Sequence, residues 1–238
     1  MPKTSPAQSK RNLRFLARES YMREYAASAM GSRFPDAVAF NAFYAALTDE
    51  QKDEFLRIAS SYLFLVKQGD WHVTVEGSNP VIDYFTNSFK LVSLFSLIES
   101  LSSEKHQDFY EWLGHIGGDI YPISNRAALK QLHEDYKTTF GSIRRCVAFF
   151  ERLSSVQQAG LCNSIQIDGA AVKSVKGVAQ FLYNLRSKFV HEGAIVLDIA
   201  NVPVMSRHKN ANTLTALSMP KLLEAFEEGV VAYFTSTA

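Results

Sequence analysis

The sequence predicts a mainly α-helical protein with a minor β element. Its seven prolines fall between the predicted elements or at their starts, never in a helical interior, where proline breaks backbone hydrogen bonding. Most of the chain between them repeats apolar residues every three or four positions, as amphipathic helices do. Only three short segments favour strands, namely residues 71–76, 195–198 and 213–217.

Three helices are expected in the N-terminal third. The first spans residues 12–30, and a second, shorter one follows Pro35. Thr48 and Gln51 have the spacing of a capping box, in which each side chain bonds the backbone N–H of the other residue, and this opens the third helix.

The helix predicted over residues 80–102 is expected at the centre of the fold. Its apolar residues point to nearly every side, and a helix that is apolar all round needs neighbours to cover it. They are Val81, Ile82, Phe85, Phe89, Leu91, Val92, Leu94, Phe95, Leu97, Ile98 and Leu101. We expect this helix to pack against the one predicted over residues 174–192.

Residues after 120 alternate helices with loops. Asn125 is expected to cap a helix that Gly141 ends, and a further helix follows. Residues 154–172 mix helix and loop. The helix from about Ser174 ends at Gly193, because glycine readily adopts the left-handed conformation that closes a helix.

The last forty residues are expected to contain a little sheet and one helix. Residues 195–198 and 213–217 would form a small hairpin or edge sheet, joined through the polar loop of residues 205–212. Pro220, at a first-turn position, opens a final helix to about Phe234.

Composition is that of a globular chain, since 47% of its 238 residues are hydrophobic and 21% are charged. We divide it into a basic flexible arm (1–12), an N-terminal helical segment (13–79) and a helical bundle (80–238), the last two forming one compact domain. The net charge is +1, but residues 1–18 and 169–191 contain basic residues and no acid. These stretches either meet a polyanion or are solvated faces.

Several function classes are disfavoured. The sequence has no glycine-rich phosphate loop, dinucleotide fingerprint, zinc-binding helix or nucleophile elbow. Its histidines lack metal-ligand spacing, so we expect no metal and no cofactor. Cys146 and Cys162 have the character of buried thiols in a reducing compartment. Arg14 and Arg18 interrupt any signal-peptide core, and we expect a cytoplasmic protein without membrane contact.

The helix that ends at Gly193 carries the most informative constellation. On a helical wheel its core stripe comprises Val178, Phe181, Leu182, Leu185 and Phe189. Arg186 lies about 80° from this stripe and His191 about 220°. The outward strip between them contains Tyr183, Ser187 and Val190. Such a strip is often covered by a second protomer or a ligand.

This pattern resembles a known family. The segment Arg186-Ser-Lys-Phe-Val-His191, followed by Gly193, resembles the Arg-x4–6-His signature of the HEPN superfamily, and within it the Apea-like proteins. The upstream Leu94-Phe-Ser-Leu-Ile-Glu-Ser-Leu101 is similar to that family's glutamate-bearing central helix. The resemblance covers roughly residues 80–236. Ser187 stands where the family often has a larger polar residue.

The resemblance implies a HEPN-like bundle of four or five helices that forms a homodimer. Such proteins often act as metal-independent endoribonucleases in toxin–antitoxin or defence systems, where an antitoxin or another protein can be a partner. Inactive members bind RNA or protein. A second copy would turn the outward Arg186 and His191 strip into a composite site across a two-fold axis.

Both residues suit RNA cleavage. The 2′-hydroxyl of RNA is itself the nucleophile, so the enzyme needs only to move two protons and stabilise a phosphorane. Histidine titrates near neutral pH, and His191 is therefore assigned as general acid or base. The guanidinium of Arg186 would hold the phosphate oxygens bidentately.

Supporting roles are assigned to neighbouring residues. Tyr183 and Asn184 would position the sugar or base, and Ser187 would donate a hydrogen bond to phosphate. The basic residues expected to line the RNA approach are Lys173, Lys176 and Lys188.

Glu99 is the remaining candidate. It falls on an apolar stripe of the 80–102 helix, where a carboxylate must be paired or protonated. We predict that it reaches the motif helix, with Arg186 as its partner; the alternative is that the stripe meets solvent near residue 99.

Three hypotheses therefore follow. The first is a ribonuclease that acts as a toxin or defence effector. The second is an inactive HEPN-like module that binds RNA or protein. The third is a structural helical protein in which Arg186 and His191 only finish a helix, His191 complementing the helix dipole.

Overall fold

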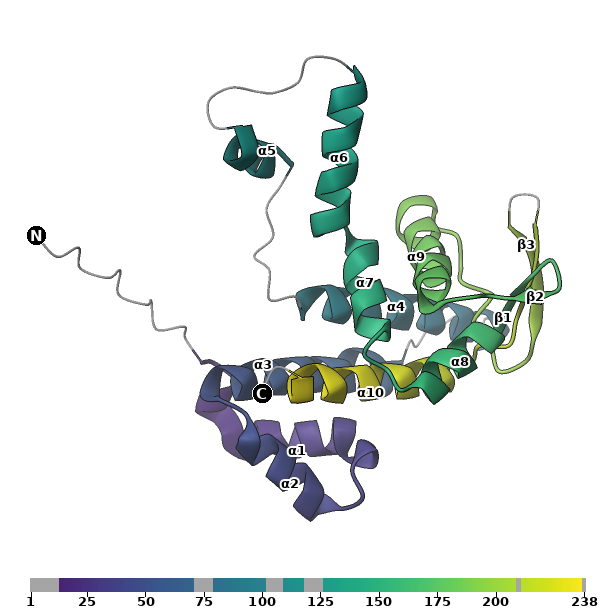
Figure 1. The fold of residues 1–238 in the computed structure, drawn as a ribbon. Coiled ribbons are helices and arrows are strands. Elements are labelled where there is room, and N and C mark those ends of the chain that lie inside the picture. Colours follow the sequence, from purple (N-terminus) through teal and green to yellow (C-terminus); the bar gives the residue numbers. More distant parts are fainter. Residues whose placement is uncertain (1–12, 71–78, 102–108, 118–125, 209–210, 237–238) are drawn as a thin grey trace, which may run out of the picture.

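The computed structural model describes residues 13–70, 79–101, 109–117, 126–208 and 211–236 (Figure 1). The predicted strand over 71–76, the cap Asn125 and the arm over 1–12 lie outside them. The mainly α-helical class is confirmed. The helical elements are η1 (Leu16–Arg18), α1 (Glu19–Met30), η2 (Gly31–Arg33), α2 (Ala37–Ala46), α3 (Asp49–Tyr62), η3 (Leu63–Lys67), α4 (Asn79–Ser100), α5 (Phe109–Gly117), α6 (Arg126–Phe140), α7 (Ser142–Phe150), α8 (Ser155–Asn163), α9 (Val175–Glu192) and α10 (Met219–Ser236).

Local hydrogen bonds account for several helix ends. Thr48 Oγ1 accepts from the N–H of Gln51 while the Gln51 side chain accepts from the N–H of Thr48, which confirms the capping box that opens α3. Ser174 caps α9 by accepting from the N–H of Gly177. Gly193 closes α9 with a φ of 66°, the left-handed conformation expected from the sequence.

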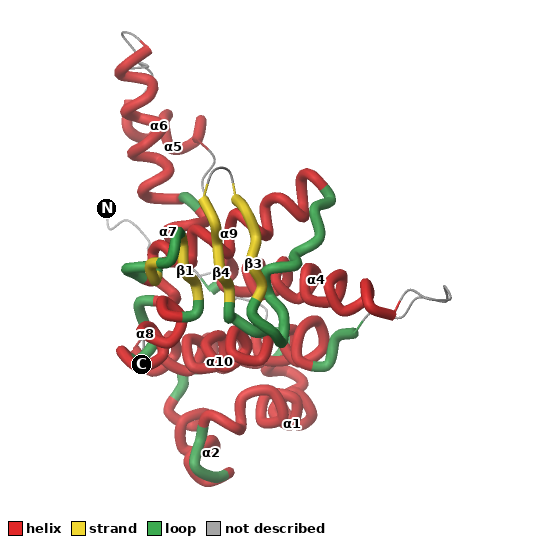
Figure 2. The backbone as a smooth tube through the Cα atoms, turned by 90° about the vertical axis from the view of Figure 1, so that its right-hand side faces the viewer, coloured by secondary structure: helices red, strands yellow, loops and turns green. Residues whose placement is uncertain are grey.

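A small antiparallel sheet covers one side of the helices (Figure 2). Its strands, in the order β2-β1-β4-β3, are β1 (Ile165–Ile167), β2 (Ala170–Ala171), β3 (Val204–His208) and β4 (Ala211–Thr215). Two predictions are corrected. Residues 195–198 lie in a loop, and the segment predicted as a polar loop contains β3, which pairs with β4.

Strand β3 was not predicted from the sequence because much of it is polar. Val204 and Ser206 are half-buried while Met205 and Arg207 are exposed, so the strand alternates as an edge strand does. Its structure depends on the register with β4, where Ser206 pairs with Thr213. Pairing partners, not local apolar content, make this segment a strand.

Helix α4 is central along its C-terminal half. Leu91, Leu94 and Phe95 are buried, and α4 packs against α3, α7 and α9. The rings of Phe95 and Tyr183 lie 6.2 Å apart, so the predicted packing of α4 on α9 is confirmed. The segment Val81–Ser100 is apolar and long enough to cross a membrane by composition, but a core helix meets the same test.

The N-terminal half of α4 departs from the prediction of a helix covered on all sides. Val81, Phe85 and Phe89 recur every four residues and remain between 38% and 45% exposed. They form one stripe, because residues four apart share a helix face. The Phe89 ring meets the Phe189 ring of α9 edge-on at 5.0 Å, so the stripe continues onto the motif helix.

Helix α10 joins the N-terminal helices to the rest of the chain. It lies along α3, with α1 and α2 on one side and α4, α7 and α9 on the other (Figure 1). Phe234 of α10 meets Phe55 of α3 at 5.4 Å, and residues from both segments share one hydrophobic core. Helix α6 continues from α7 and extends away from this core, with α5 beside it.

Candidate functional site

Helix α9 is held between other elements of the fold. Val178, Ala179, Leu182 and Leu185 are buried, and the helix packs against α7, α4 and α8. This burial follows the predicted core stripe. The neighbours cover more of the helix than the wheel predicted, because α4 and α7 also reach toward the side that carries Tyr183 and Arg186.

Arg186 is therefore half-buried and not fully outward. Its Cζ lies 5.8 Å from the centre of the Tyr183 ring, within the range of a cation–π contact. Its Nε atom is buried and has no hydrogen-bond partner. Tyr183 is also half-buried, since it packs against Phe95 of α4.

His191 lies at the other end of the predicted strip. It is exposed, in the last turn of α9, where a cation is favoured by the helix dipole. Val190 beside it is 47% exposed. Of the two predicted catalytic residues, His191 is exposed to solvent, whereas Arg186 lies toward the neighbouring helices.

Three other predicted residues lie on the face of α9 that is turned toward the sheet. Asn184, Ser187 and Lys188 line a groove of about 540 Å³ between α9 and the sheet, and Ile167 and Thr213 contribute its opposite side. Tyr183 faces α4 instead, so it does not share this groove with Asn184. Lys173 and Lys176 are exposed near the start of α9.

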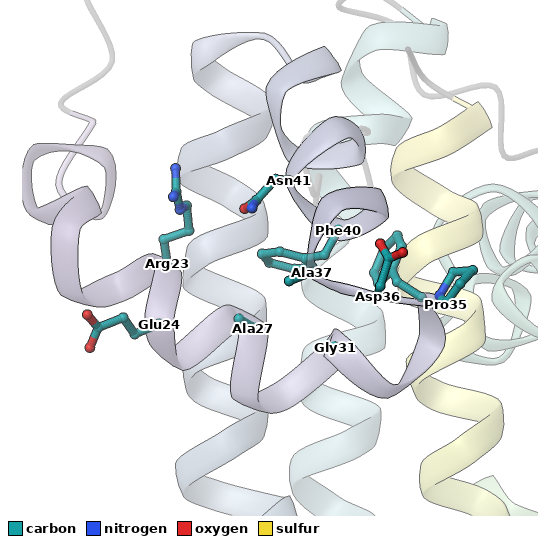
Figure 3. A pocket seen from close by; sticks show the side chains of 10 residues that line it. Arg23, Glu24, Ala27, Gly31, Pro35, Asp36, Ala37, Phe40 and Asn41 are labelled. Atoms are coloured by element: carbon teal, nitrogen blue, oxygen red, sulfur yellow. The ribbon is translucent and has the colours of Figure 1, made fainter.

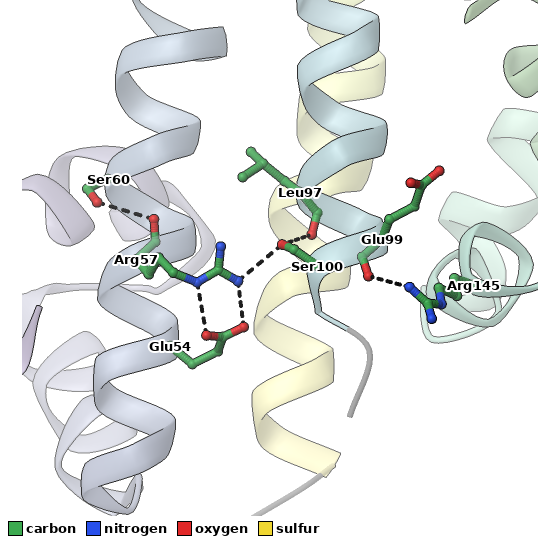
Figure 4. Close-up of polar contacts among 7 residues, drawn as sticks. All are labelled: Glu54, Arg57, Ser60, Leu97, Glu99, Ser100 and Arg145. Atoms are coloured by element: carbon green, nitrogen blue, oxygen red, sulfur yellow. Dashed lines mark hydrogen bonds and ion pairs between the residues drawn. The ribbon is translucent and has the colours of Figure 1, made fainter. Parts of the chain in front are cut away.

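Glu99 does not pair with Arg186 as predicted. Its side chain is half-buried rather than in open solvent, yet its Oε1 atom is buried with no hydrogen-bond partner. Its backbone carbonyl accepts a hydrogen bond of 3.2 Å from Nη1 of Arg145, while its carboxylate points away from that guanidinium (Figure 4). The predicted ion pair with α9 is absent among the residues that the structure describes.

Arg145 of α7 is the residue that sequence analysis missed. Its Nε and Nη2 atoms are buried without hydrogen-bond partners, although the side chain as a whole is half-exposed. Its neighbour Arg144 is exposed, and nothing in the local sequence distinguishes the two. The inward direction of Arg145 is set by how α7 packs on α4.

Cys146 of α7 is a buried thiol whose pKa is affected by these charged groups. Burial raises the pKa of its thiol, and the charge of Glu99 raises the pKa further, whereas Arg186 and Arg145 lower it. All three charged groups therefore lie close enough to act on one buried sulfur atom. Because the raised pKa keeps the thiol protonated at neutral pH, Cys146 is not a nucleophile here.

A second groove and the grouping of possible metal ligands also bear on where a site could lie. A groove of about 430 Å³ between α1 and α2 is lined by Arg23, Glu24, Asp36 and Phe40, with Asp36 also capping α2 (Figure 3). It contains none of the predicted site residues. Among the described residues, no three His, Cys, Asp or Glu side chains are grouped so that they could hold a metal ion.

Comparison of the chain with protein-family models, curated proteins and solved structures finds no match. The chain's own residues provide a half-buried arginine, an exposed histidine on the same helix and neighbouring charged side chains whose hydrogen bonding is incomplete among the described residues.

Proposed function

We propose that the protein is a metal-independent endoribonuclease of HEPN type, acting in the cytoplasm as a homodimer and serving as a toxin or defence effector. In this proposal Arg186 holds the scissile phosphate and His191 transfers protons. A second His191, from the other copy, supplies the complementary acid or base.

The observation that carries the proposal is the state of Arg186. The Nε atom of the half-buried Arg186 is buried and has no hydrogen-bond partner among the described residues, and no described acidic side chain forms an ion pair with this guanidinium. Leaving a charged group unpaired in this way is unfavourable, and an anion removes the penalty. The oxygens of a phosphodiester match the planar guanidinium fork.

The exposure of His191 suits the proton transfers. One imidazole would take the proton of the attacking 2′-hydroxyl, which then forms a bond to phosphorus. The phosphorane breaks the bond to the 5′-oxygen, and a second, protonated imidazole delivers a proton to that leaving oxygen. Arg186 opposes the negative charge that develops on the non-bridging oxygens.

The apolar stripe of α4 supports the homodimer. Val81, Phe85 and Phe89 are exposed, and the Phe89 ring contacts the ring of Phe189 on α9, the helix that carries His191. Exposed apolar side chains gathered on one face gain free energy when a second surface covers them. If a second copy covers this stripe about a two-fold axis, the two His191 side chains approach each other.

The basic residues would guide RNA toward the site. Lys173 and Lys176 are exposed at the start of α9, and Lys188 lines the groove that also contains Asn184 and Ser187. Binding through phosphate contacts releases counterions and weakens as salt rises. The groove would hold the sugar or base of a neighbouring nucleotide.

The decisive experiment incubates the purified 238-residue chain with a structured RNA in the presence of a chelator. We expect cleavage that His191→Ala lowers by about 100- to 10,000-fold, the usual contribution of a positioned acid or base. Arg186→Ala should lower it as well. His133→Ala, which removes an exposed histidine from α6, is the matched control and should leave cleavage unchanged.

One observation favours a second candidate, an inactive module that binds RNA or a protein such as an antitoxin. Within one chain Arg186 is half-buried and His191 is exposed, so the pair is not assembled by the monomer. RNA that binds to the dimer but stays intact would select this function. A chain that neither binds nor cleaves RNA would support the third hypothesis, a structural helical protein.

A further inference from the structure

Three helices that are distant in sequence bring charged side chains to one place. Glu99 comes from α4, Arg145 from α7 and Arg186 from α9, and the charges of all three act on the buried Cys146 thiol. Each of the three side chains keeps part of its surface exposed. The three residues are thus neither fully buried nor fully exposed.

The cluster is unusual because its hydrogen bonding is incomplete. Glu99 Oε1, Arg145 Nε, Arg145 Nη2 and Arg186 Nε are all buried and have no hydrogen-bond partner among the residues that the structure describes. Buried polar atoms are nearly always paired, so a group of four in one place requires an explanation. Each unpaired atom carries a desolvation penalty.

A buried carboxylate elsewhere in the fold has several partners, although the Nε of one of them, Arg33, also lacks a hydrogen bond. The carboxylate of Glu227 in α10 accepts hydrogen bonds from Tyr62 at 2.8 Å and Lys67 at 2.9 Å, and it forms an ion pair with Arg33 at 3.2 Å. Glu99 and the two nearby arginines are not arranged to satisfy one another in this way. No partner for these atoms lies among the residues that the structure describes, and a bound ligand would supply one.

The donor and acceptor types define the chemistry of that partner. Two guanidinium groups offer N–H donors and positive charge, which suit phosphate oxygens. A carboxylate accepts hydrogen bonds, so Glu99 would bind a hydroxyl or N–H donor on the same ligand. A ribose phosphate provides both, whereas a DNA phosphate lacks the 2′-hydroxyl.

We propose that Glu99, Arg145 and Arg186 form a subsite that recognises a ribose-phosphate unit of RNA. Arg145 joins Arg186 in donating to the phosphate, and Glu99 accepts from the 2′-hydroxyl of the nucleotide on the 3′ side, which is not the attacking hydroxyl. This inference rests on the proposed RNA substrate and deepens it, since it names the groups that distinguish RNA from DNA.

The test measures binding separately from cleavage. The 238-residue chain with His191→Ala is titrated with two labelled oligonucleotides of one uridine-containing sequence, one with ribose and one with deoxyribose. We expect the ribose form to bind about tenfold more tightly, the effect of one charge-assisted hydrogen bond. Glu99→Ala added to this chain should remove the preference.

Arg145 is tested in the same His191→Ala background across a range of salt concentrations. Arg145→Gln should weaken binding of both oligonucleotides about tenfold and reduce the slope of log affinity against log salt by about 0.7, the value for one lost phosphate contact on a single strand. Arg144→Gln removes the exposed neighbouring charge and is the matched control. Arg145→Lys keeps the charge but loses the fork, so it should recover the slope and only part of the affinity.

The outcomes separate this inference from the proposed cleavage. If the wild-type chain leaves RNA intact but prefers ribose in a manner that depends on Glu99, the subsite stands and the nuclease proposal fails. If RNA is cleaved but Arg145→Gln binds it like Arg144→Gln, the subsite is rejected. Circular dichroism melts establish that each variant is folded. If Arg145→Gln unfolds, the binding measured for Arg145→Lys and Glu99→Ala decides whether the subsite binds RNA.

Discussion

The buried Glu227 network offers the sharpest stability prediction. Its side chain in α10 is only 5% exposed and is paired with Arg33 after α1 and Lys67 after α3, whose side chains are 25% and 30% exposed. Tyr62 donates a further hydrogen bond to the same carboxylate. Glu227→Ala leaves both cations and the tyrosine hydroxyl without this partner.

The expected loss follows from the burial. Removing one partner of a buried ion pair costs about 3–5 kcal/mol, because the other charge remains without compensation. Since both cations here are partly exposed and water can solvate them, we expect the lower end, about 3 kcal/mol. For a chain of this length that corresponds to a melting temperature lower by about 6–12 °C.

The assay is equilibrium urea unfolding followed by circular dichroism, with thermal melts as a second measure. Glu227→Gln keeps an acceptor for Tyr62 but not the charge, so it should lose less stability than Glu227→Ala. Glu224→Ala, at an exposed position of the same helix, should change stability by less than about 0.5 kcal/mol. Equal losses for Glu224→Ala and Glu227→Ala would refute the reasoning.

Two further predictions concern a helix end and the second copy. Gly193→Ala should destabilise the chain by about 1 kcal/mol because its φ is positive. Gly160→Ala, at an unobstructed position in α8, should stabilise it by about 0.5–1 kcal/mol. Changes in the free energy of unfolding with the same sign for both variants, measured in urea, would contradict this prediction. Phe85→Glu should halve the mass measured by light scattering, whereas Val156→Glu, at an exposed position of α8, should leave the dimer intact. A monomeric wild-type chain would exclude the proposed interface.

The sequence by itself determined the elements whose causes are local. The capping box of Thr48 and the left-handed end at Gly193 depend on hydrogen bonds within a few residues, and both were predicted. The apolar pattern also predicted that α4 and α9 pack together. It did not predict which half of α4 is covered, because exposure depends on the neighbours and not on the pattern itself.

Only the tertiary structure decided the strand β3 and the surroundings of Arg186. Val204–His208 has two apolar residues followed by three polar ones, without alternation, and becomes a strand through its register with β4. Arg186 was singled out by its motif spacing, but its burial comes from α4 and α7. Arg145 lies 46 residues from Glu99, and no local rule connects the two. Helix packing places these charges around one buried thiol, and a sequence pattern confined to one helix cannot reveal such a meeting.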